Sequence, residues 1–84
     1  MTEQADAKLQ QIVRATLDLP GDVDVTSAQQ STIESWDSLA HVTLMLAIES
    51  EFAVAIDVAD QIHLTSYSAI SSYLEERGVS GAFP

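Results

Sequence analysis

The sequence predicts an all-α domain: a four-helix bundle with a short third helix and a long loop between the first two helices. Three observations predict it. Apolar residues recur at helical spacing in three segments, Pro-Gly and Gly interrupt the chain, and alternating strand patterns are absent. Eighty-four residues, 46% of them hydrophobic, suffice for one core and argue against disorder. We expect a single domain over residues 1–84, with 79–84 as a flexible tail.

The first helix is predicted over about residues 3–17. Its apolar face follows the helical period at Leu9, Ile12, Val13, Thr16 and Leu17. Pro20-Gly21 ends it, since proline lacks an N–H and glycine favours turns. Residues 19–36 then form a connection that is long for a compact domain, and such loops are often functional or packed by their own side chains.

The second helix is predicted from about residue 38 to 52, with Asp37 or Ser35 as its N-cap. It carries two apolar faces. One holds Leu44, Met45, Ile48 and Phe52, together with His41. The other holds Leu39, Val42 and Leu46. One face should pack on the core. The other is either covered by the long loop and the short third segment, through Val58 and Ile62, or is open to something outside the domain.

The short third segment, residues 57–63, has room for one or two helical turns. Thr65 or Ser66 can cap a final helix that runs to about residue 77 and ends at Gly78. The apolar row of that helix is Tyr67, Ile70, Tyr73 and Leu74.

Charge restricts the kinds of partner that the chain can have. Thirteen acids face three basic residues, for a net charge of −10, and no lysine or arginine occurs between Ala15 and Glu76. Such a surface repels nucleic acid and anionic membranes and favours basic patches on other proteins. No apolar run approaches the roughly 18 residues of a membrane helix, and the N-terminus lacks a secretion-signal layout. We therefore expect a cytoplasmic, monomeric protein without nucleic-acid or membrane partners.

Ser38 is the most informative single residue. It lies at the predicted start of the second helix, between Asp37 and Leu39, where its hydroxyl should be exposed and close to apolar surface. That combination suits a covalent attachment point better than a catalytic one. A phosphate attached there would meet the N–H groups and the dipole of the helix terminus. The negative charge of Asp37 opposes such an anion, so Asp37 is better explained as an N-cap or as an acid that a modifying enzyme recognises. The chain also contains no cysteine.

The stretch Asp37-Ser38-Leu39, followed by an apolar helix ending in Ile48-Glu49-Ser50-Glu51-Phe52, resembles the acyl carrier protein family. The resemblance extends through residues 52–56 and 64–70 to Tyr73-Leu74 and covers essentially the whole chain. It implies a bundle whose Ser38 carries 4′-phosphopantetheine, with Asp37 as the motif acid. A phosphopantetheinyl transferase installs this arm, and its thiol holds acyl groups as thioesters. The implied partners are an acyl-loading enzyme (an acyltransferase or an adenylating ligase) and a ketosynthase or other acyl-processing enzymes.

The sequence departs from this family where fatty-acid carriers place acids, since Ala40 and Thr43 stand there, with His41 between them. This favours a discrete carrier of a polyketide, hybrid peptide–polyketide or other specialised pathway over a generic fatty-acid partner. The predicted partner surface combines apolar and acidic residues: Trp36, Leu39, Val42, Leu46, Ile62, Glu49 and Glu51. His41 is expected to be half-buried against the first or last helix.

Within the carrier class, the rival is an aminoacyl or peptidyl carrier loaded by an adenylating enzyme. Outside it, the rival is an acidic helical interaction module that is never modified. A hydrolase triad of Asp37, Ser38 and His41 lacks a nucleophile elbow and a cleft, so we expect no enzymatic activity. A calcium loop starting at Asp22 lacks the required glycine and closing glutamate, so we expect no metal site.

Overall fold

The computed structural model describes residues 3–78, which form four α-helices and one short 3₁₀ helix, with no strand in that range. The helices are α1 (Glu3–Thr16), α2 (Ser38–Phe52), α3 (Val58–Gln61) and α4 (Tyr67–Glu76), and the 3₁₀ helix η1 (Val25–Ser27) lies in the long loop. The predicted all-α class and the short third helix are confirmed. The expected tail over 79–84 lies outside the described residues.

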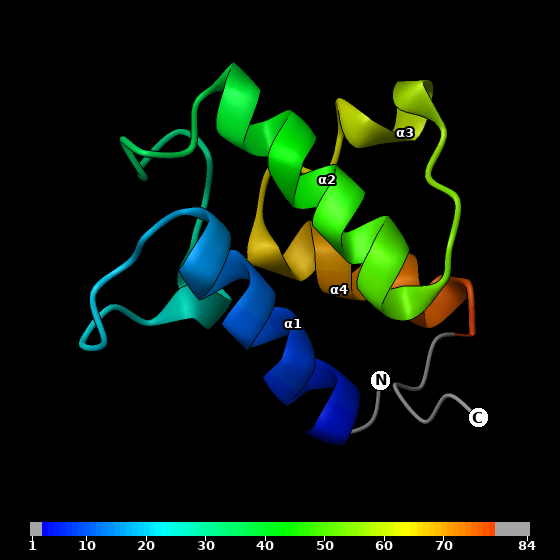
Figure 1. Cartoon of the computed structure of the whole chain (residues 1–84), viewed down its shortest axis with the longest axis horizontal. Helices are drawn as coiled ribbons and strands as arrows, with labels where there is room; N and C mark the ends of the chain where they lie inside the picture. The colour runs from blue at the N-terminus through cyan, green and yellow to red at the C-terminus, as the bar shows by residue number, and fades with distance from the viewer. Residues whose placement is uncertain (1–2, 79–84) are drawn as a thin grey trace.

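Helices α1 and α2 run side by side in opposite directions, and α4 lies behind α2 (Figure 1). Helix α1 ends before Pro20, because Asp18 takes a left-handed conformation (φ 53°). The N–H of Leu19 then donates to the carbonyl of Arg14. Among the helices within residues 3–78, none has the length and apolar character that crossing a bilayer requires.

The long loop is packed down by specific contacts. Asp24 caps η1 by accepting from the N–H of Thr26, and the Arg14 guanidinium donates to the carbonyls of Pro20 and Val23. Ser35 donates its hydroxyl to the carbonyl of Leu17 at 2.7 Å, so it ties the loop to the end of α1 rather than capping α2.

The middle of the same loop pairs with the chain before α4. Gln30 N–H donates to the carbonyl of Thr65 at 2.8 Å, and Tyr67 N–H donates to that of Ala28 at 2.9 Å. An isolated antiparallel bridge joins Gln29 to Ser66. These contacts fix residues 28–30 beside residues 65–67 and place the loop against the start of α4.

The core lies between α1, α2 and α4 and includes side chains from the loop. The first predicted face of α2 is buried at Leu44, Met45, Ile48 and Phe52, as expected. Ser66 caps α4 by accepting from Ala69 N–H, and Gly78 ends that helix with φ 74°. Helix α3, in contrast, buries no side chain and is flanked by two buried residues, Ile56 and Leu64.

Candidate functional site

The N-terminus of α2 presents Ser38 as its first residue. Asp37 adopts an extended conformation (φ −87°, ψ −176°), and its Oδ1 accepts from Ala40 N–H at 2.8 Å, which confirms it as the N-cap. Its carbonyl accepts from His41 N–H at 2.9 Å. The side chain of Ser38 is exposed, as expected. Its hydroxyl can therefore be reached by a modifying enzyme.

Ser38 lies on the rim of a hollow of about 380 Å³ between α2 and α3. Helix α2 contributes Ser38, His41 and Val42, and the α3 side contributes Val58, Gln61 and Ile62. Gln30 from the long loop and Thr65 complete the lining. Neither of these two was identified as a site residue from the sequence, because their approach depends on the pairing of residues 28–30 with 65–67.

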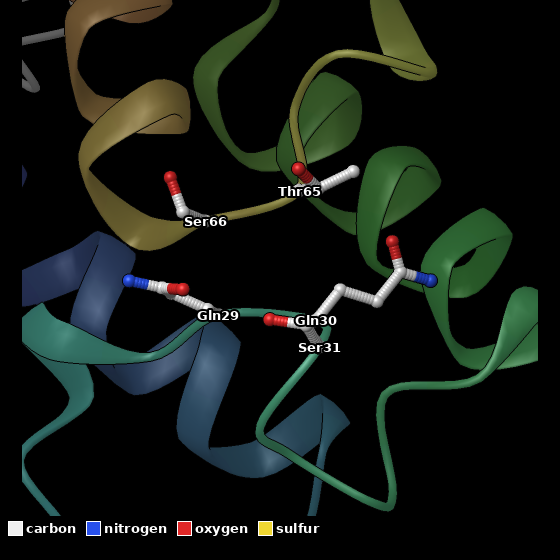
Figure 2. Close-up of a pocket in the computed structure, with 5 residues that line it drawn as sticks. All are labelled: Gln29, Gln30, Ser31, Thr65 and Ser66. Atoms are coloured by element: carbon white, nitrogen blue, oxygen red, sulfur yellow. The ribbon is translucent and has the colours of Figure 1, made fainter.

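Gln30 and Thr65 also line a second, polar hollow of about 630 Å³, together with Gln29, Ser31 and Ser66. Figure 2 shows the side chain of Gln30 extending from the loop toward α2, while Thr65 and Ser66 approach from the opposite side. The five residues carry no charge. The surface next to the Ser38 hollow is therefore neutral and polar on the loop side.

The second apolar face of α2 remains uncovered. Leu39 is 77% exposed and Leu46 is 60% exposed, while Val42 borders the hollow. Across the hollow, Val58 and Ile62 are also exposed, so the short third helix does not cover this face. Together, Leu39, Val42, Leu46, Val58 and Ile62 are referred to as the apolar patch. Of the predicted partner surface, the four aliphatic residues are thus available to a partner.

The prediction that Trp36 belongs to the partner surface is wrong. Its side chain is only 2% exposed and forms part of the core, so a docking protein cannot reach it. The burial has a local cause, because the long loop turns inward just before α2, and the indole Nε1–H finds an acceptor in His41 Nδ1 at 3.0 Å.

His41 is half-buried, as expected, and its hydrogen bonds and ring contact are with the loop and with α3. Its ring is near Trp36, with centroids 6.1 Å apart, and its Nε2 lies 2.7 Å from the carbonyl oxygen of Gln61 at the end of α3. The imidazole therefore joins the loop, α2 and α3.

The two predicted partner acids have intramolecular contacts. Glu49 is half-buried, and its Oε2 accepts from Ile56 N–H at 2.9 Å, which ties the α2–α3 connection to α2. Glu51 pairs with Lys8 at 3.4 Å. Glu49 is thus partly structural, whereas the Glu51 side chain stays about half exposed.

The three basic residues of the chain all have anionic or carbonyl partners within the fold. Lys8 donates to the Glu51 carbonyl, Arg14 to the loop carbonyls, and Arg77 pairs with Asp60 at 3.5 Å. The surface available to partners is consequently dominated by acids. A basic partner surface would meet little opposing charge there.

The geometry does not assemble a hydrolase triad. Asp37 is engaged with Ala40, and both ring nitrogens of His41 are engaged with Trp36 and Gln61. An activated serine needs its base at hydrogen-bond distance and that base oriented by an acid.

Within residues 3–78, no group of three or more His, Cys, Asp or Glu side chains is arranged to hold a metal ion. In the segment considered as a calcium loop, hydrogen bonds from Thr26 lower the pKa of Asp24.

No protein-family model, curated protein or solved structure matches this chain. The assignment of a function therefore rests on the site itself.

Proposed function

We propose that this protein is an acyl carrier protein with a bundle of the acyl carrier type, bearing 4′-phosphopantetheine on Ser38. The single observation that carries the proposal is the placement of Ser38: an exposed hydroxyl on the first residue of α2, at the rim of a partly apolar hollow and beside the apolar patch. A carrier needs these three features together, for attachment, for its cargo and for its partners.

The residues at this position fit a phosphodiester. The first N–H groups of a helix have no intrahelical acceptor, and here Asp37 takes that of Ala40. Those of Ser38 and Leu39 are in the first turn, where an anion on Ser38 Oγ is favoured by the helix dipole. In the transfer, Ser38 Oγ loses its proton and displaces the nucleotide from the phosphopantetheine phosphate of coenzyme A. When bound, the arm supplies a thiol that holds the acyl group.

The residues of this chain would then hold the arm and present its acyl cargo, and partner enzymes would carry out the chemistry. Two residues of the apolar patch follow Ser38 within the first turns of α2: Leu39 is the next residue, and Val42, one turn further on, also lines the hollow. A partner with an apolar recess and a basic rim fits this surface, because the chain carries thirteen acids and its three basic residues have partners within the fold. The partners proposed are a phosphopantetheinyl transferase, an acyltransferase or adenylating ligase, and a ketosynthase or other acyl-processing enzyme of a specialised pathway.

Intact mass spectrometry tests the proposal. Co-expression with a promiscuous phosphopantetheinyl transferase should add the mass of one arm to the wild-type chain and none to Ser38→Ala. Ser50→Ala is the matched control, because Ser50 is an exposed serine at the other end of the same helix and should leave the addition unchanged. A wild-type chain that stays unmodified would favour the unmodified interaction module instead.

A second assay separates the two carrier classes. The arm-bearing protein is incubated with coenzyme A thioesters and an acyltransferase, and in parallel with amino acids, ATP and an adenylating enzyme. Loading from acyl donors supports the acyl carrier. Loading with amino acids alone would assign the chain to the aminoacyl or peptidyl class.

A further inference from the structure

The imidazole of His41 is fixed in one neutral tautomer by its two partners. The Trp36 Nε1–H can only donate, so His41 Nδ1 must accept and carries no proton. The ring proton of the neutral imidazole is then on Nε2, which donates to the carbonyl oxygen of Gln61 at 2.7 Å. The ring thus links a buried indole to the last residue of α3.

Helix α3 has little else to hold it in place. It buries no side chain, and Val58 and Ile62 are mostly exposed. On the α4 side, Asp60 accepts from Tyr73 Oη at 3.2 Å and pairs with Arg77. On the α2 side, among the hydrogen bonds of the described residues, His41 supplies the one from a side chain of α2 to α3 itself.

The same hydrogen bond joins the two walls of the Ser38 hollow. His41 belongs to the α2 wall and Gln61 to the α3 wall. The separation of these walls at this point is therefore set by a contact of 2.7 Å between them. A guest that has to pass between the walls at this point must move α3 away from α2 and break this contact.

We propose that His41 is a positioning residue of the carrier site: it tethers α3 to α2 and so limits the size of the acyl cargo that the hollow can shelter. The proposal rests on the proposed function, because it requires cargo attached through Ser38. A short acyl chain leaves the tether intact. A long or branched one enters only when the tether opens, which leaves His41 Nε2 without its acceptor while Nδ1 still accepts from the Trp36 indole.

The protein carries its own reporter for this event. Trp36 is the only tryptophan of the chain, so its indole N–H gives a single resonance in a nitrogen-15 correlation spectrum. That resonance reports on the imidazole of His41 that accepts from the indole, and the environment of this imidazole changes when its Nε2 separates from Gln61. The experiment loads the arm-bearing protein with straight acyl chains of increasing length and records the indole resonance and the rate of thioester hydrolysis.

In the wild type, short chains should leave the indole resonance unchanged, and chains beyond the capacity of the hollow should shift it. His41→Leu, which lacks both hydrogen bonds, should protect longer chains from hydrolysis than the wild type does. His41→Gln offers an amide oxygen to Trp36 and an amide N–H to Gln61, so it should restore the wild-type length limit. His63→Leu, the same change at an exposed histidine just after α3, is the matched control and should behave as wild type.

Two results would overturn the proposal: an indole resonance that no cargo moves in the wild type, or one length limit shared by wild type and His41→Leu. The first needs no variant, so it remains decisive if His41→Leu folds poorly.

The tether can also be tested without the arm. In the unmodified protein, amide exchange at Gln61 and Leu64 should be faster in His41→Leu than in His63→Leu by about two- to tenfold, the range expected for one neutral hydrogen bond. Equal exchange in both variants would refute the tether. A chain that shows the tether but is never modified at Ser38 would refute the carrier function and leave the tether standing.

Discussion

Asp37 combines two roles in one side chain: it caps α2, and we propose that a phosphopantetheinyl transferase recognises it. Two substitutions can separate these roles. Its Oδ1 caps α2 through Ala40 N–H at 2.8 Å, and within the described residues its other oxygen has no hydrogen-bond partner. Asp37→Ala removes the cap and should lower the free energy of unfolding by about 1 kcal/mol, with a range of about 0.5–2 kcal/mol. For a domain of this size, that corresponds to a fall in Tm of about 4–8 °C.

Asp37→Asn keeps the capping oxygen and removes the charge. Asparagine caps about as well as aspartate, and the lost attraction to the helix dipole, about 0.3–1 kcal/mol, is offset by weaker repulsion in a chain of net charge −10. Its Tm should therefore stay close to that of the wild type. If the free carboxylate oxygen is what the transferase and its metal ion recognise, arm transfer should slow in both variants.

Thermal unfolding by circular dichroism and the rate of arm transfer are measured on the same preparations. Asp57→Ala is the matched control, because Asp57 holds the N-cap position of α3 without a side-chain capping bond and should cost little stability. A Tm for Asp37→Asn as low as that of Asp37→Ala would refute the capping argument. A wild-type transfer rate in Asp37→Asn would refute the recognition role.

Three further predictions concern stability and docking. Tyr67 donates its hydroxyl to Asp6, and burial together with this carboxylate raises its pKa above the ordinary 10.0. The stabilisation that this Tyr67–Asp6 hydrogen bond provides is therefore complete below about pH 10 and is lost as pH rises through the raised pKa of Tyr67 in the folded state. Tyr67→Phe should lower the free energy of unfolding by about 1.5–3 kcal/mol at neutral pH. In urea titrations, the free energy of unfolding of this variant should also fall less steeply at alkaline pH than that of the wild type. An equally steep alkaline loss in Tyr67→Phe would exclude this assignment. Self-repulsion at net charge −10 should make the Tm rise with added salt or millimolar magnesium at neutral pH, and a Tm independent of ionic strength would contradict it. Val42→Ala and Leu46→Ala should each lower kcat/KM for a partner enzyme about fivefold, from about 1 kcal/mol of lost contact, at unchanged Tm; unaltered transfer with every partner would remove these residues from the docking surface.

The helices could be predicted because their signals are local. The buried row of α2 follows from the spacing of Leu44, Met45, Ile48 and Phe52, and the capping residues Asp37 and Ser66 follow from side-chain chemistry next to each helix start. The exposed hydroxyl of Ser38 follows from the same position.

The contacts that complete the site could not be predicted in this way. Gln30 reaches the hollow because its main chain pairs with Thr65, and pairing between distant loop segments leaves no periodic pattern in the sequence. Trp36 precedes the site in the chain, but its exposure depends on how the loop folds back, and it is buried. Glu49 stands in an acidic run typical of a surface, yet its carboxylate reaches the N–H of Ile56 across the turn that ends α2.

Site-resolved mass spectrometry of the chain after treatment with coenzyme A and a phosphopantetheinyl transferase tests the central claim most directly. The account predicts one arm per chain, located by fragmentation on Ser38, and one titratable thiol where the unmodified, cysteine-free chain has none. An arm on another residue, or a folded chain that no transferase modifies, would contradict it.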